Sequence, residues 1–72
     1  MKMTLQEAWA GFVFELHRSG KWDGLSRTER QYFDKTNRII KKGGLPVLRV
    51  ARLFEKYAPG AYRLSVSVER LP

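Results

Sequence analysis

The chain has 72 residues, of which 43% are hydrophobic, and a formal net charge of +7. A chain of this length forms one domain, residues 1–72, with a small core and little material for a buried active-site cleft. Because it contains no cysteine, disulfides, a thiolate nucleophile and cysteine-based metal sites are excluded.

The positive charge is concentrated in the last two-thirds of the chain. Residues 1–25 carry equal numbers of acidic and basic side chains, whereas residues 26–72 carry the whole excess of +7. Basic surfaces gain binding free energy by releasing counterions from phosphates. The charge pattern therefore predicts a polyanionic partner, with nucleic acid as the first candidate.

The first predicted element is a helix that begins after Thr4. The tetrapeptide Thr4-Leu5-Gln6-Glu7 has the T-x-x-E form of a capping box, and Ser19-Gly20 ends the helix. Between them, apolar residues at helical spacing form one stripe: Leu5, Ala8, Trp9, Phe12, Val13 and Leu16. Met1-Lys2-Met3 leads into the cap without a signal-peptide pattern or an apolar run that could span a bilayer, so we expect a soluble, cytoplasmic protein without a membrane partner.

Two more helices are predicted after a turn at Lys21–Gly24. Ser26-Arg27-Thr28-Glu29 has the form of a second capping box and opens a helix to about Lys42, where Gly43-Gly44 ends it. Pro46 suits the first turn of a third helix, and Pro59-Gly60 breaks its pattern.

The segment from Tyr62 to Glu69 alternates between apolar and polar residues, which predicts a β-strand, although an irregular segment or a final helical turn over Ser65–Leu71 is an alternative. A lone strand leaves backbone groups unpaired, so it needs a neighbour. That neighbour is the backbone before Thr4, the backbone around Gly43-Gly44-Leu45, or a strand of a partner protein. The predicted fold is mainly α: three amphipathic helices in a small bundle with a C-terminal β-strand.

The sequence offers no arrangement of residues that predicts catalysis. His17 is the only histidine, and it lies in a last helical turn, where a cation suits the helix dipole. The paired glycines stand at helix ends and form no phosphate-binding loop. We therefore expect no enzymatic activity, no metal, no cofactor and no small-molecule substrate.

The second and third predicted helices each have a basic face. Placing residues at 100° intervals gathers the cations of the second helix opposite Tyr32 and Ile39, and those of the third away from Val47 and Phe54. If the two faces lie side by side, they form a platform that could follow a phosphate backbone; otherwise they are ordinary solvated faces. The candidate nucleic-acid-binding residues are Arg30, Arg38, Lys41, Lys42, Arg49, Arg52 and Lys56.

Two aromatic residues lie outside the apolar stripes. Phe14 is on the opposite side of its helix from the stripe, and Trp22 is in the turn. Either they cover the small core, or they anchor a protein partner, as aromatic residues do at interface hot spots. With the apolar side of the predicted strand, the candidate protein-partner residues are Phe14, Trp22, Leu64, Val66 and Val68.

The stretch Leu48–Phe54 resembles the first helix of a helix-turn-helix unit, with Ala51 at the position where a small residue is favoured. Pro59-Gly60 and the alternating segment occupy the place of the recognition helix, so only a winged variant stays open.

With MTLQEAWAGF opening the first helix and LPVLRVARLF opening the third, the chain resembles small lytic-phage proteins that bind host RNA polymerase and inhibit initiation or suppress termination. The resemblance implies a non-enzymatic transcription regulator, active for example in antitermination, that binds RNA polymerase or another transcription protein. A small DNA-binding repressor or excisionase and an RNA-binding protein are the alternatives.

Overall fold

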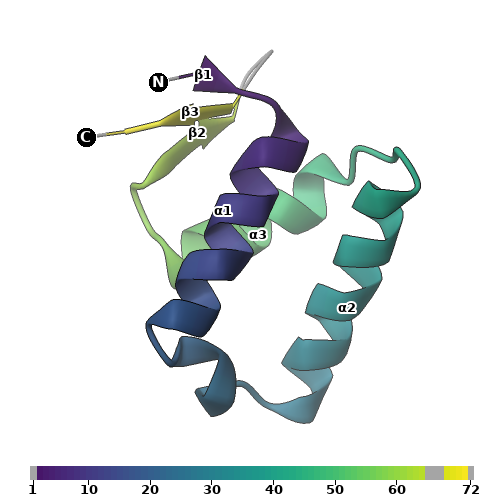
Figure 1. Ribbon diagram of the computed structural model, residues 1–72, viewed down its shortest axis with the longest axis vertical. Helices are drawn as coiled ribbons and strands as arrows, with labels where there is room; N and C mark the ends of the chain where they lie inside the picture. The colour runs from purple at the N-terminus through teal and green to yellow at the C-terminus, as the bar shows by residue number, and fades with distance from the viewer. Residues whose placement is uncertain (1, 65–67, 72) are drawn as a thin grey trace.

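The computed structural model describes residues 2–64 and 68–71, and most of them are helical (Figure 1). The elements in chain order are β1 (Lys2–Met3), α1 (Leu5–Arg18), the 3-10 turn η1 (Lys21–Gly24), α2 (Arg27–Lys41), α3 (Val47–Tyr57), β2 (Tyr62–Leu64) and β3 (Val68–Arg70). The predicted fold class of three helices with a C-terminal strand is confirmed.

Both predicted helix starts are confirmed, but their caps differ. Thr4 Oγ1 accepts from the backbone N–H of Glu7 at 3.1 Å, and the Glu7 carboxylate accepts from the backbone N–H of Thr4 at 3.0 Å, which completes the capping box. Ser26 Oγ likewise accepts from the backbone N–H of Glu29 at 3.1 Å. The prediction of a second full capping box is wrong, because the Glu29 carboxylate is bound by side chains of α3 instead of returning to Ser26.

The core is formed where the three helices meet. Phe12 of α1 lies edge-on to Phe54 of α3, with ring centroids 4.9 Å apart, and Trp9 packs beside Phe33 of α2 at 5.7 Å. The Trp9 Nε1–H donates to Asn37 Oδ1 at 3.1 Å, so the indole is satisfied as well as buried. The core residues are Ala8, Trp9, Phe12, Leu16, Phe33, Ile40, Val50, Leu53, Phe54 and Val68.

The three short strands form an antiparallel sheet in the order β1-β3-β2, next to the start of α1 and on the side away from α2 (Figure 1). Of the neighbours that the sequence left open, the backbone before Thr4 is the one that pairs with the C-terminal segment, since Met3 is opposite Val68.

The prediction of a single strand from Tyr62 to Glu69 is wrong. β2 ends at Leu64, and β3 begins at Val68 and pairs antiparallel with β2. Two antiparallel segments satisfy each other's backbone groups, and alternation alone does not distinguish them from one longer strand.

Candidate nucleic-acid interface

Four exposed cations lie along one side of α2 and at its C-cap residue, Lys42. Lys35, Arg38 and Lys42 are spaced at i, i+3 and i+7, and Lys41 lies beside them. The centre of this row, Arg38, is about 180° around the helix from Glu29, which faces α3. Within the part of the chain that the structure describes, these side chains make no hydrogen bond or ion pair. We call Lys35, Arg38, Lys41 and Lys42 the cationic ridge.

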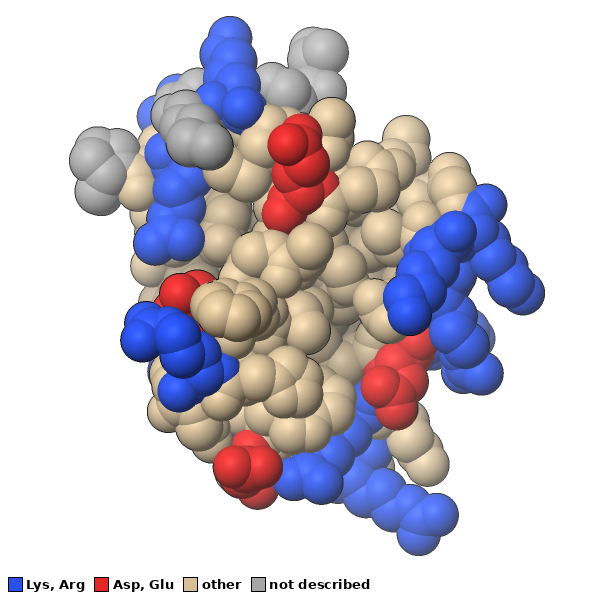
Figure 2. Space-filling model, viewed as in Figure 1, with Lys and Arg blue, Asp and Glu red and all other residues tan. Residues whose placement is uncertain are grey.

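The space-filling view shows the same distribution of charge. In Figure 2 blue side chains gather on the right, along α2, with a red side chain next to them, and other blue side chains lie at the top and on the left. The ridge cations are exposed and make no ion pair among the described residues, so they can exchange water and counterions for phosphate oxygens without breaking a contact within the protein. One carboxylate, that of the exposed Asp34, lies on the same side of α2.

The cations of α3 are bound to α2. Arg52 Nη1 donates to Glu29 Oε1 at 2.9 Å, and Lys56 Nζ donates to Oε2 at 2.6 Å. The hydroxyl of Tyr57 also donates to Oε2, at 2.8 Å. Hydrogen bonds from Arg52 and then Lys56 lower the pKa of the buried Glu29 carboxyl to about 2, so Glu29 stays ionised and holds α3 against α2.

Arg49 also belongs to this helix contact. Its Nε donates to Thr36 Oγ1 at 2.9 Å, and its Nη2 donates to the carbonyl oxygen of Tyr32 at 3.1 Å. The Arg49 guanidinium carbon lies 3.9 Å from the centroid of the Tyr32 ring, so a cation–π contact adds to the hydrogen bonds. Arg49 closes the α2–α3 contact rather than facing water.

Arg30 is bound to the turn that precedes α2. Its Nη2 donates to the carbonyl oxygens of Trp22 and Asp23 at 3.3 and 3.1 Å. The guanidinium also lies over the Trp22 ring, 5.7 Å from its centroid, and thus holds η1 on α2.

The seven predicted nucleic-acid-binding residues therefore separate into two groups. Arg38, Lys41 and Lys42 lie together in the ridge, whereas Arg30, Arg49, Arg52 and Lys56 are bound within the protein. The structure does not form one platform from both helices, because the basic face of α3 contacts α2 instead of lying beside its basic face. Sequence reasoning missed Lys35, which the spacing to Arg38 and Lys42 could have found.

The two candidate aromatic anchors have different surroundings. Phe14 is 64% exposed on α1 and is available to a partner. Trp22 is half-buried, stacked on His17 with ring centroids 4.6 Å apart and edge-on to Phe33 at 5.6 Å. Trp22 therefore covers the core, which was the alternative interpretation of this residue.

The strand residues predicted to contact a partner lie mostly inside the protein. Val68 is only 2% exposed, Leu64 is half-buried against the core, and Val66 lies outside the described residues. β3 is paired on both sides, so the outer edges of the sheet belong to the short strands β1 and β2. The burial of Val68 removes it as a surface anchor, because its side chain completes the core.

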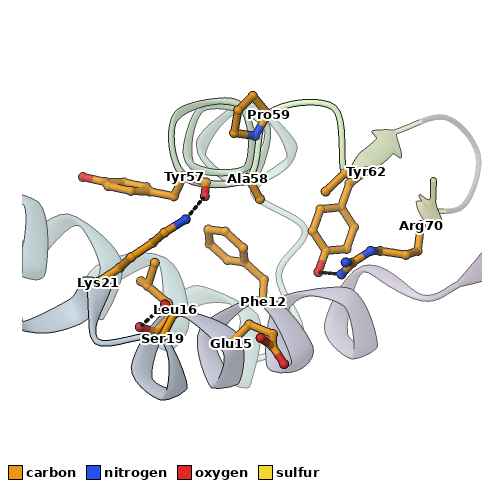
Figure 3. A pocket seen from close by; sticks show the side chains of 11 residues that line it. Phe12, Glu15, Leu16, Ser19, Lys21, Tyr57, Ala58, Pro59, Tyr62 and Arg70 are labelled. Atoms are coloured by element: carbon orange, nitrogen blue, oxygen red, sulfur yellow. Dashed lines mark hydrogen bonds between the residues drawn. The ribbon is translucent and has the colours of Figure 1, made fainter. Parts of the chain in front are cut away.

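A pocket of about 270 Å³ lies between α1 and the connection from α3 to β2 (Figure 3). The ring of Phe12 lies between two cations that line the pocket. Lys21 Nζ donates to the carbonyl oxygen of Tyr57 at 3.3 Å, and Arg70 Nη1 donates to the hydroxyl of Tyr62 on the neighbouring strand at 3.2 Å. Ser19 Oγ is turned to the Leu16 carbonyl oxygen. The polar groups drawn here thus mainly hold the wall together.

The described residues offer neither a metal site nor a membrane-spanning helix. Within residues 2–64 and 68–71, no group of three or more His, Cys, Asp or Glu side chains could hold a metal ion. The described helices include none with the length and apolar character needed to cross a bilayer. Comparisons with protein-family models, curated proteins and solved structures find no match.

Proposed function

We propose that the protein is a non-enzymatic, cytoplasmic transcription regulator that contacts nucleic acid through the cationic ridge of α2 while it is bound to RNA polymerase. The observation that carries the proposal is the ridge itself, four exposed cations without partners among the described residues. Its effect would be a change in initiation or in termination, including antitermination. The resemblance of the sequence to small phage regulators supports RNA polymerase as the protein partner.

The physical case for phosphate binding is that the ridge cations make no ion pair among the described residues. Cations that are already paired with a carboxylate, as Arg52 and Lys56 are with Glu29, have part of their charge compensated and attract another anion less strongly. The ridge cations need only release counterions, and each phosphate contact to duplex DNA contributes about 0.9 to the slope of log affinity against log salt. Four such contacts supply a sequence-independent, salt-sensitive affinity.

The test of the ridge compares two triple variants with the same change in charge. Arg38→Gln/Lys41→Gln/Lys42→Gln removes three ridge cations, whereas Lys2→Gln/Arg18→Gln/Lys21→Gln removes three cations from other surfaces. Binding is measured by fluorescence anisotropy on a labelled DNA duplex and on a labelled single-stranded RNA, across a salt series. Circular dichroism checks that both variants fold.

We expect the ridge variant to lose about ten-fold or more in affinity and about 0.9 in salt slope for each phosphate contact removed. The control variant should retain most of the affinity. If both variants weaken binding equally, the effect is one of net charge and the ridge is not the interface. If neither does, the proposal is wrong. Preference for duplex over RNA separates the DNA-binding and RNA-binding alternatives.

The role in transcription needs its own measurement, with purified bacterial RNA polymerase as the probe. The protein should co-elute with the polymerase in gel filtration and alter either promoter-dependent initiation or readthrough of a terminator in a purified transcription reaction. Nucleic-acid binding without either effect would reject the polymerase role and leave a simple nucleic-acid-binding protein.

A winged DNA-binding protein is the second candidate, favoured by one observation. α3 is followed directly by the antiparallel pair β2 and β3, a helix-then-hairpin order that winged proteins use. Against it, Arg49, Arg52 and Lys56 of α3 are bound to α2, so the helix that would enter the major groove has its cations occupied. The candidate predicts a sequence-specific site, which selection of bound DNA from a random pool would reveal.

A further inference from the structure

Three of the large hydrophobic side chains exposed in the described structure lie within four residues of one another. Leu45, Val47 and Leu48 are 63%, 47% and 87% exposed, at the end of the molecule where α2 turns into α3 (Figure 1). Single exposed apolar residues are ordinary, whereas a group of them at one projecting turn marks a contact surface. We call Leu45, Val47 and Leu48 the apolar tip.

Backbone hydrogen bonds hold the apolar tip in place. The N–H groups of Gly43 and Gly44 donate to the carbonyl oxygens of Ile40 and Ile39 at 3.0 and 2.9 Å, which ties the turn to the last turn of α2. The N–H of Val47 then donates to the carbonyl oxygen of Leu45 at 2.8 Å.

Pro46, between them, has φ −79° and ψ 70°, the values of an inverse γ-turn. Gly44 packs so closely on Ile39 that an added Cβ would lie 2.6 Å from its Cγ2. The tip is thus presented in one conformation by hydrogen-bonded backbone.

The apolar tip follows the cationic ridge directly in the chain. Leu45 is three residues beyond Lys42, and Lys41 ends α2 itself. Leu45 therefore lies within three or four residues of two of the cations that would hold a polyanion. Phosphate binding explains the cations of this end of the molecule, but it gives no role to three aliphatic side chains.

Other occupants fit this surface less well. A second copy of the chain would bring two ridges of like charge together, which opposes self-association. Protein hot spots favour Trp, Tyr and Arg, whereas Leu and Val are under-represented there. Proteins that bend DNA, in contrast, insert aliphatic wedges such as Leu, Ile or Pro between base pairs, beside cations that hold the backbone.

We propose that the apolar tip is a wedge that inserts between base pairs of duplex DNA while the cationic ridge holds the adjacent phosphates, so that the DNA is unstacked and kinked. Unstacking one step exposes apolar base faces, which the Leu45 and Leu48 side chains cover. Wedges of this kind kink the duplex by about 20–90°. The inference rests on the proposed nucleic-acid contact and adds to it the substrate class and the deformation.

The experiment uses two DNA probes with the full chain. One duplex carries the fluorescent base 2-aminopurine at a central TA step, where unstacking raises the emission, and the other carries a donor and an acceptor dye at its ends to report bending. The variant is Leu45→Ser/Leu48→Ser, which alters two exposed side chains. The matched control is Ala10→Ser, which makes an apolar-to-polar change at an exposed residue of α1 that belongs to no candidate site.

At saturating protein, wild type and Ala10→Ser should raise 2-aminopurine emission several-fold and increase energy transfer between the duplex ends. Leu45→Ser/Leu48→Ser should lose both signals while its salt slope stays that of the wild type, because the ridge is intact. Equal signals from the double variant and the wild type, or duplex binding by the wild type without either signal, would overturn the wedge and leave the phosphate contact standing. No binding to duplex DNA by the wild type would reject both proposals.

Two further measurements separate the remaining occupants. If the double variant abolishes co-sedimentation with vesicles of phosphatidylglycerol and phosphatidylcholine, yet leaves the DNA signals unchanged, the tip is a membrane contact and the wedge is refuted. If sedimentation shows a wild-type dimer that the double variant dissociates, and the DNA signals again stay unchanged, the tip is a contact between copies.

Discussion

Replacing Glu29 with glutamine should destabilise the protein at neutral pH and have a much smaller effect in acid. The carboxylate accepts hydrogen bonds from Arg52, Lys56 and Tyr57, and it is the buried contact between the start of α2 and the end of α3. Glutamine keeps the shape of the side chain but leaves two cations beside an uncharged amide. The cost therefore comes from charge and not from packing.

The size of the effect follows from the lowered pKa of Glu29. A fall from 4.5 to about 2 corresponds to about 3.4 kcal/mol of folding free energy, at about 1.36 kcal/mol for each pKa unit. The side chains of Arg52 and Lys56 are 46% and 52% exposed, and water screens their charges, so we reduce this figure by about half. The expected loss is about 1–2 kcal/mol, a large part of the stability of so small a domain.

The stabilisation that Glu29 contributes should depend on pH. Because the pKa of Glu29 is lower in the folded protein, its contribution is fully present above pH 4.5 and is lost as the pH falls toward 2. Urea unfolding, followed by tryptophan fluorescence, measures the free-energy difference between wild type and Glu29→Gln at neutral pH and near the folded-state pKa. That difference should shrink in acid.

The matched control is Glu55→Gln, which makes the same chemical change at an exposed residue of α3. It should leave the free energy of unfolding within about 0.5 kcal/mol of the wild type. The reasoning is refuted if Glu29→Gln is no less stable than Glu55→Gln at neutral pH, or if its deficit is as large in acid as at neutral pH.

The remaining predictions concern helix caps and glycines. Thr4→Ala and Ser26→Ala should each lower the free energy of unfolding by about 0.5–2 kcal/mol, because each removes an acceptor for a backbone N–H of the first helical turn; unchanged thermal melting would contradict this. Gly44→Ala should destabilise, since its Cβ would lie 2.6 Å from Ile39 Cγ2, whereas Gly11→Ala should stabilise α1 by about 0.5–1 kcal/mol, since its Cβ meets nothing within 4 Å. Melting temperatures that shift in the opposite directions would show that the packing around these glycines is different.

Local patterns in the sequence were sufficient for the helices, but they predicted one strand where the structure has the two strands β2 and β3. The hydroxyls of Thr4 and Ser26 cap backbone N–H groups three residues away, so the signal and the structure it specifies lie within one helical turn. The apolar stripe of α1 likewise predicts its buried face, because burial follows the 3.6-residue period. The pairing of Val68 with Met3 was among the alternatives that the sequence left open, because few segments of backbone lay outside the predicted helices.

Only the tertiary structure determined which partner each charged side chain of α2 and α3 binds. Glu29 stands at the position of a capping-box glutamate, but its carboxylate turns to Arg52 and Lys56, 23 and 27 residues away, because a buried carboxylate with several charge-assisted hydrogen bonds is held more firmly than an exposed one with a single bond. For the same reason Arg49 faces Tyr32 and Thr36, whereas the cations of α2 that point away from α3 are exposed without an ion pair among the described residues. Helical period places these residues on faces, whereas the angle at which α3 meets α2 determines which basic face becomes a contact inside the protein and which is left to bind a partner.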